Sequence, residues 1–453
     1  MNKIIVSKSF LLGLFLVFFS QTAFSGELSV QSENKELIKG IEERKVYFER
    51  THELKKLIDD IGKRELVLLG EASHGTSEFY SWRAEITKEL VKSGNYGFIA
   101  VEGDWASLYD VNNYVKHKSN RDGNARNVLR EIERWPLWMW ANNEVADFVE
   151  WLRNYNKDKE PAERIGFYGM DAYGEQQSAR EIIRVVRAHK PDISPEVQER
   201  LKCFMDFRDR VGDYIRQVAQ GGESCERPIS EVYSIVKSNL QDLKRGNPEK
   251  YFYLMQNIYV VKAAEAHYRL NISGQDESWN ARAVHMFETV LRLQEKYSNN
   301  SAGIVWAHNT HIGDASATDM RLNGQVNIGH LSKEKYGIKK VYAVGFSTHR
   351  GRVMAASEWE GQRRVFDVPE GISGSLENLL NGISSNKSFY FIMEEELSEN
   401  NDWLNRIGHR AIGVIYHPER ERLGNYVPSV LPLRYNAMIF IPETGPVVPL
   451  HRR

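Results

Sequence analysis

The stretch Leu66-Val67-Leu68-Leu69-Gly70-Glu71-Ala72-Ser73-His74-Gly75 decides the fold. Its first four residues are apolar without alternation, which is typical of a strand covered on both faces. Similar apolar runs occupy 98–101, 165–168, 304–306, 341–346, 390–393 and 411–415. Amphipathic segments such as 77–91 and 144–155 lie between them, and alternating strands and helices predict an α/β fold with a mostly parallel sheet flanked by helices.

Two further regions have helical spacing. Residues 36–62 carry apolar positions at the period of a helix, and 177–299 continue this spacing without a convincing strand. We therefore expect an α/β catalytic core formed by 26–176 and 300–453. The segment 177–299 is predicted to be a large helical insertion that forms a lid or a pocket wall.

The charge balance bears on the class of partner. The 453 residues contain 60 Lys plus Arg and 61 Asp plus Glu, and there is no long block of one sign. A protein that binds a polyanion needs such a block, so we expect no nucleic acid as a partner. A small-molecule substrate is the expected partner, and the oligomeric state stays open.

Residues 1–25 have the layout of a secretory signal peptide. Lys3 and Lys8 precede an apolar run over 10–19, and small residues follow over 20–26. The run is short for a membrane span, which needs about 20 residues. We expect a periplasmic or secreted protein that is soluble after signal cleavage, with an uncleaved anchor as the alternative.

The chain has two cysteines, Cys203 and Cys225. In an oxidising compartment a disulfide between them would stabilise the fold by about 3 kcal/mol on the chain-entropy model. Two unpaired thiols are the alternative. Neither residue has the histidine pattern of a catalytic cysteine.

Ionisable residues follow five of the predicted strands. They are Glu71 and His74 after the first, Glu102 and Asp104 after the second, Asp171 after the third, His308 and His311 after the fourth, and His349 after the fifth. The carboxyl ends of parallel strands meet at one edge of the sheet, which is where such folds bind ligands. The sequence therefore predicts an active site at this edge.

His74 is the predicted general base. Gly70 and Gly75 allow unusual backbone torsions around it, and an unperturbed histidine pKa near 6.5 suits proton transfer at neutral pH. Glu71 or Glu102 would hold the imidazole in one tautomer. A turn histidine that only caps the next helix is the alternative.

The pair His308 and His311 has two interpretations. Together with Glu71 and His74 these histidines could ligate zinc, or they could donate hydrogen bonds to a developing oxyanion. We expect no required cofactor, with a metal held by Glu71, His74, His308 and His311 as the open alternative.

Other polar and aromatic residues complete the predicted site. Arg83 lies nine residues after His74 and could reach a carboxylate or a substrate oxygen, or form an ordinary ion pair. We expect Asp104, Asp171, Trp138 and His349 to bind substrate, although helix capping is an alternative for both aspartates.

Missing motifs narrow the reaction. The sequence has no GxSxG nucleophile elbow, no GxGxxG after the first strand and no GxxxxGK[ST] loop. Water activated by a histidine base is the remaining hydrolytic mechanism.

Six ordered motifs between Gly70 and Trp359 resemble the erythromycin esterases. They are Gly70-Glu71-Ala72-Ser73-His74-Gly75, Val101-Glu102-Gly103-Asp104, Arg134-Trp135-Pro136-Leu137-Trp138-Met139-Trp140, Phe167-Tyr168-Gly169-Met170-Asp171-Ala172-Tyr173, Trp306-Ala307-His308-Asn309-Thr310-His311-Ile312-Gly313-Asp314 and Gly345-Phe346-Ser347-Thr348-His349-Arg350-Gly351.

This resemblance implies a hydrolase that opens the lactone ester of a macrolide antibiotic. It implies that His74 is the general base, Glu71 and Glu102 its supporting carboxylates, and Arg83 a charged partner, with His308 and His311 on the other side of the site. Relatives commonly have an Arg-Asp pair opening a helix and a Met-Ala pair further on. Here the chain reads Gln275-Asp276-Glu277-Ser278-Trp279-Asn280-Ala281, which leaves the pocket shape and the substrate open.

Two alternatives to a macrolide esterase remain from the sequence. One is an exported metal-dependent hydrolase of another ester or of a peptide. The other is a non-catalytic periplasmic metal-binding protein.

Overall fold

The computed structural model describes residues 34–62, 64–118, 123–207, 210–297, 302–393 and 401–451. Its strands are β1 (Val46–Tyr47), β2 (Leu66–Leu69), β3 (Tyr96–Asp104), β4 (Gly166–Asp171), β5 (Ala302–Trp306), β6 (Val341–Ala355), β7 (Arg364–Val368), β8 (Phe389–Ile392), β9 (Ile407–Arg410), β10 (Tyr426–Ser429) and β11 (Ala437–Thr444). Its α-helices are α2 (Lys35–Arg44), α3 (Lys55–Ile61), α4 (Ser77–Ser93), α5 (Trp105–Val115), α6 (Ala125–Leu129), α7 (Asn143–Asn156), α8 (Glu175–His189), α9 (Ser194–Met205), α10 (Val211–Ala219), α11 (Glu226–Asn239), α12 (Gln241–Gly246), α13 (Pro248–Leu270), α14 (Gln275–Lys296), α15 (Asn309–Ile312), α16 (Ile328–Tyr336), α17 (Leu376–Ser384), α18 (Glu421–Gly424) and α19 (Leu431–Arg434).

A mostly parallel sheet lies at the centre of the molecule, as the sequence predicted. Its order is β1-β8-β11-β6-β2-β5-β3-β4, and β7 pairs with the far end of β6. The neighbours from β11 to β4 pair in parallel, whereas β8 and β1 add an antiparallel edge. Strands β9 and β10 form a separate antiparallel pair.

Alternate residues of the strands belong to two hydrophobic cores, one on each face of the sheet. Leu66 and Leu68 of β2 join the core on one face with α8, α9, α11, α13 and α14, and Val67 and Leu69 join the core on the other face with α3, α4, α5 and α7. All four side chains are fully buried. Successive strand side chains point to opposite faces, so a strand covered on both sides must be apolar throughout.

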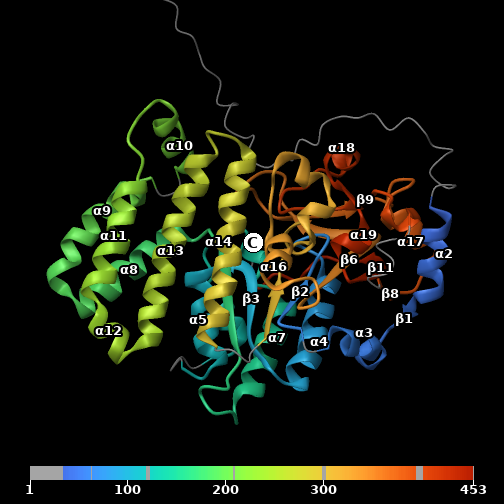
Figure 1. Ribbon diagram of the computed structural model, residues 1–453, viewed down its shortest axis with the longest axis horizontal. Coiled ribbons are helices and arrows are strands. Elements are labelled where there is room, and N and C mark those ends of the chain that lie inside the picture. Colours follow the sequence, from blue (N-terminus) through green and yellow to red (C-terminus); the bar gives the residue numbers. More distant parts are fainter. Residues whose placement is uncertain are drawn as a thin grey trace, which may run out of the picture.

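Helices α8 to α14 follow one another between β4 and β5. In Figure 1 the green and yellow helices α8 to α13 gather on one side of the sheet, and the long helix α14 runs between them and the strands. Cys203 in α9 and Cys225 before α11 form a disulfide with an S–S distance of 2.06 Å. The bridge expected from the sequence is therefore confirmed.

Three predicted elements differ from the structure. The run 411–415 is not a regular strand, because only Ile412 and Ile415 form isolated bridges. The additional parallel neighbour of β6 is instead β11, which the sequence analysis missed. The helix expected over 36–62 is interrupted by the short strand β1, whose two residues pair with β8.

The predicted signal peptide over 1–25 lies outside the described residues. In the described part of the chain, no helix combines the length and the apolar character that crossing a membrane requires.

Candidate active site

The parallel register brings the predicted strand ends together. Leu69 of β2 lies opposite Trp306 of β5, which in turn lies opposite Val101 of β3, and Val101 pairs with Gly169 of β4. The residues at or just beyond the carboxyl ends of these strands therefore share one edge. Those residues are Glu71, His74, Glu102, Asp171, His308 and His311, and all are buried.

Glu71 holds His74 from one side. Its Oε1 lies 2.8 Å from Nδ1 of His74, and its Oε2 accepts a hydrogen bond of 2.6 Å from Nη2 of Arg83. A carboxylate can only accept, so Nδ1 of His74 carries a proton. In the neutral ring the lone pair is then on Nε2, which lies on the side of Glu102 at 4.0 Å from Oε1.

Gly70 and Gly75 are needed for space and not for unusual torsions. Neither has a positive φ. A Cβ on Gly70 would lie 2.1 Å from Oδ1 of Asn309, and one on Gly75 would lie 1.9 Å from the carbonyl oxygen of Met354. The two glycines thus let α15 and β6 approach the His74 turn closely.

Arg83 supports Glu71 from behind. Its side chain is fully buried, its guanidinium carbon lies 4.5 Å from the ring centre of Tyr80, and it lies 5.2 Å from that of Trp306. Its Nη2 donates to Oε2 of Glu71, so Arg83 positions this carboxylate.

Glu102 ties the second side of the site together. Its Oε2 accepts the main-chain N–H of His308 at 2.9 Å, and its Oε1 lies 2.8 Å from Nη2 of Arg282 and 3.2 Å from Nε2 of His311. Burial alone would raise the pKa of Glu102, but its neighbours His311, His74 and Arg282 hold it well below its usual range. Glu102 is therefore an anion at neutral pH.

The same carboxylates act on His74. Burial alone would lower its pKa, but the charges of Glu102 and Glu71 outweigh burial and raise it above 6.5. A buried imidazole between two anions is thus a stronger base than a free one.

His308 supplies a donor without a partner. Its Nδ1 accepts the main-chain N–H of Thr310 at 3.3 Å, and burial lowers the ring's pKa well below 6.5, helped by the neighbouring His74. Nδ1 also lies 2.8 Å from Oγ1 of Thr310, so the neutral ring carries its proton on Nε2. This atom is buried and makes no hydrogen bond of ordinary geometry, although a contact with the main chain of Ala72 raises the pKa of the ring. The His74 and His308 ring centres are only 4.9 Å apart.

Arg282 of α14 is a site residue that the sequence analysis missed. It donates from Nε and Nη2 to the two oxygens of Asp171, each at 2.8 Å, and from Nη2 to Glu102. Its Nη1 lies 3.2 Å from Nε2 of His311. The sequence did contain a signal for Arg282. Polar residues recur with helical spacing on one buried face of α14, at Ser278, Arg282, His285 and Thr289.

Trp279 covers His311. The two rings are stacked, with centres 4.6 Å apart and planes 7° from parallel. The indole N–H donates to the carbonyl of Val326 at 2.7 Å, which fixes the ring over the histidine. Trp279, which lies in the stretch that departs from the pattern of the relatives, is therefore a wall of the site.

The remaining predicted residues have different surroundings. Asp104, the last residue of β3, pairs with Arg134 at 3.6 Å at the rim of the cluster and makes no helix-capping hydrogen bond. Trp138 is 1% exposed and belongs to the hydrophobic core. His349 in β6 accepts the N–H of Gly371 at 3.3 Å. The structure thus brings neither Trp138 nor His349 into the histidine cluster.

A resident metal ion does not fit the residues as they are arranged. Atoms of Glu71, His74 and Glu102 lie within 4.8 Å of one another, close enough for one ion. However, both oxygens of Glu71 are bonded to His74 and Arg83, and those of Glu102 to Arg282 and the His308 main chain. The arginines already supply positive charge to these carboxylates, so an ion would compete with them.

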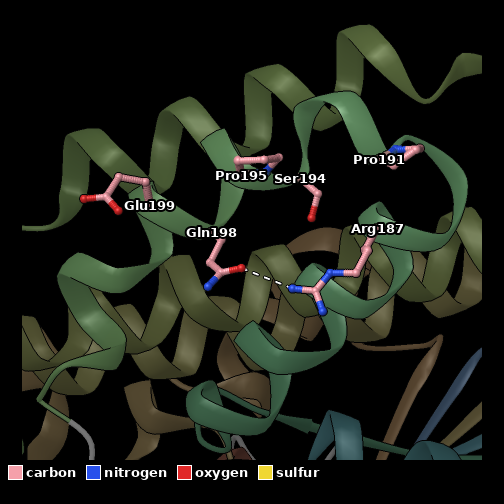
Figure 2. Close-up of a pocket in the computed structure, with 6 residues that line it drawn as sticks. All are labelled: Arg187, Pro191, Ser194, Pro195, Gln198 and Glu199. Atoms are coloured by element: carbon pink, nitrogen blue, oxygen red, sulfur yellow. Dashed lines mark hydrogen bonds between the residues drawn. The ribbon is translucent and has the colours of Figure 1, made fainter.

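The cluster is nearly enclosed, since only 10% of the His74 side chain is exposed. Two cavities of the described surface lie elsewhere. One of about 350 Å³ is lined by residues of α8 and α9 and their connection, where Arg187 donates to Gln198 at 3.2 Å (Figure 2). The other, of about 360 Å³, lies beside α4. Neither shares a lining residue with the cluster.

Comparison with known proteins gives a matching family model and related sequences. The family model described as "Erythromycin esterase" matches residues 91–444. A "Putative hydrolase YbfO" of Bacillus subtilis is 22% identical over 87% of this chain and 86% of its own length. The "Erythromycin esterase type II" of Escherichia coli is 21% identical over 75% of this chain and 83% of its own length.

Three solved structures share the fold. A succinoglycan biosynthesis protein has a TM-score of 0.73 at 22% identity, covering 94% of this chain and 100% of its own. A Bacillus cereus protein has a TM-score of 0.75 at 18% identity, with coverage of 92% and 99%. A mutant of the erythromycin esterase EreC in its open conformation has a TM-score of 0.64 at 14% identity, with coverage of 87% and 95%.

Proposed function

The chain belongs to the erythromycin esterase family, and on that basis we propose that it opens the lactone ester of an erythromycin-like, fourteen-membered macrolide and confers macrolide resistance. The observation that carries this proposal is the pairing of His74, whose Nε2 is free to accept a proton, with the unpartnered Nε2–H of His308. A base and an oxyanion donor on neighbouring rings are what ester hydrolysis requires.

In the proposed first step, His74 activates a water molecule. Nε2 of His74 takes a proton from water, and the water oxygen adds to the ester carbonyl carbon. The carbonyl oxygen becomes an oxyanion, which accepts the Nε2–H of His308. Glu71 stabilises the resulting imidazolium through Nδ1, as the carboxylate does in a catalytic triad.

In the second step, the bond between the carbonyl carbon and the alkoxy oxygen breaks. The imidazolium of His74 returns its proton to the departing oxygen, so the products are a carboxylic acid and an alcohol. Arg83 and Arg282 act in this scheme as positioning residues, because each holds one of the carboxylates that flank the base. We propose that no resident metal takes part.

The test of this function is mass spectrometry of erythromycin incubated with the purified mature protein, with and without a chelator. We expect a product heavier by one water in both samples. An unchanged drug would contradict the macrolide as substrate. Loss of the product only in the chelator sample would favour the metal-dependent alternative, and stoichiometric bound metal without hydrolysis of any ester would favour a metal-binding protein.

The pH dependence of hydrolysis follows from the raised pKa of His74. Because the base must be neutral, kcat/KM should rise with pH, with a midpoint above 6.5. In Glu71→Gln one of the two anions is lost, so the midpoint should move to lower pH. The check is kcat/KM measured from about pH 5 to about pH 9, and an identical midpoint in the variant would contradict this electrostatic role.

We also propose that the protein is exported. The signal-like layout of 1–25 and the disulfide between Cys203 and Cys225 support this location, since disulfides persist in oxidising compartments.

A further inference from the structure

Three aromatic rings gather at the rim of the histidine cluster. The ring centres of Trp135 and Trp359 are 4.7 Å apart, and those of Tyr173 and Trp359 are 6.1 Å apart. Trp135 and Trp359 are partly exposed, whereas Tyr173 is buried. We refer to Trp135, Tyr173 and Trp359 as the aromatic cage.

A cation of the protein itself already lies in this cage. The guanidinium carbon of Arg134 is 4.0 Å from the ring centre of Tyr173 and 5.8 Å from that of Trp359. Its ion pair with Asp104 is 3.6 Å long, and a quarter of its side chain is exposed. Arg134 is thus held loosely, by ring faces and a long ion pair, where another cation could replace it.

The same Tyr173 ring connects the cage to the proposed catalytic cluster. The guanidinium carbon of Arg282 lies 5.1 Å from the Tyr173 ring centre. Tyr173 of the cage therefore contacts both Arg134 and the arginine that binds Glu102 and Asp171. We expect a substituent close to an ester at His74 to reach the cage.

Two buried carboxyl groups lie near the cage. Asp104 pairs with Arg134, and Glu175 interacts with both Asp104 and Arg134. Burial raises the pKa of Asp104 and that of Glu175, so each of these carboxylates would be stabilised by a further cation nearby.

We propose that the aromatic cage binds an aliphatic ammonium group of the substrate, which displaces the guanidinium of Arg134 and lies beside Asp104. The inference rests on the proposed hydrolase function for the identity of this ligand as part of a substrate. Ring faces bind alkylammonium ions through cation–π attraction, and the carboxyl groups of Asp104 and Glu175 disfavour an anionic substituent at the same place.

The test uses tetramethylammonium as the probe and saturation-transfer NMR titration of the mature protein as the readout. We expect saturable binding that weakens about 2- to 30-fold in Trp359→Ala and less in Trp359→Phe. Arg134→Gln should bind the probe more tightly, because the competing cation is gone. A ring cluster with a purely structural role would not give this gain.

Two controls keep the test specific. Trp82→Phe, in a partly buried tryptophan beside the separate cavity at α4, should bind the probe like the unmodified protein, and neutral tert-butanol should show no saturable binding. His74→Ala should lose hydrolysis and keep ammonium binding, which separates this site from the proposed reaction. Equal binding of the neutral probe, or unchanged binding in both Trp359→Ala and Arg134→Gln, would overturn the proposal.

Discussion

Replacing His74 by alanine is expected to lower kcat/KM for ester hydrolysis by about 100- to 10,000-fold. Glu71 orients the His74 ring through Nδ1 and leaves Nε2 as the basic nitrogen. We therefore expect no second group in the cluster to take over the proton transfer. Initial rates with the unmodified protein and the variant at the same pH measure the effect.

A surface histidine provides the matched control. His417 is more than a third exposed and pairs with Glu419, so His417→Ala should keep full activity. Thermal unfolding of both variants checks that the fold is intact. A folded His74→Ala protein with nearly full activity would contradict the mechanism.

Replacing Arg282 by methionine should cost about 3–5 kcal/mol of folding free energy. The side chain is 8% exposed and bonds to Asp171 and Glu102, and burial of these carboxylates without a cation is unfavourable. Activity should fall as well, because the pKa of Glu102 would rise and the anion beside His74 would be lost. Urea unfolding and kcat/KM measure the two effects.

Two further variants test whether the effect comes from the loss of a buried charge. Arg282→Lys keeps a cation and should recover part of the stability, although one ammonium cannot reproduce the bidentate contact with Asp171. Arg227 pairs with Glu231 at the surface with 89% of its side chain exposed, and Arg227→Met should change little. An equal effect of the Arg282 and Arg227 methionine variants would contradict the role of Arg282.

The fold was predictable where strands are buried on both faces. The run Leu66–Leu69 has no polar residue. It ends in register with the neighbouring strands, which places Glu71 beside the ends of β3 and β5. Pairing of strands was not predictable in the same way. The apolar run 411–415 forms only isolated bridges, whereas β11 is a strand although it contains Pro442, a position skipped in its register with β6.

The site was predictable where it follows strands. Glu71, His74, Glu102, Asp171, His308 and His311 meet because parallel strands end at one edge. Arg282 comes from a helix more than 100 residues after Asp171 in the chain, and only tertiary packing brings the two together. The sequence left open whether Arg83 reaches a carboxylate or a substrate oxygen, and in the structure it binds the carboxylate of Glu71.

The central claim is that water, and not a carboxylate of the protein, attacks the ester. The direct test is a single turnover in oxygen-18 water, with the protein in excess over an ester that it hydrolyses. We predict that one labelled oxygen appears in the product carboxylate in the first turnover, with none in Glu71 or Glu102. Unlabelled product accompanied by label in either glutamate would show covalent attack by the protein and would contradict His74-activated water.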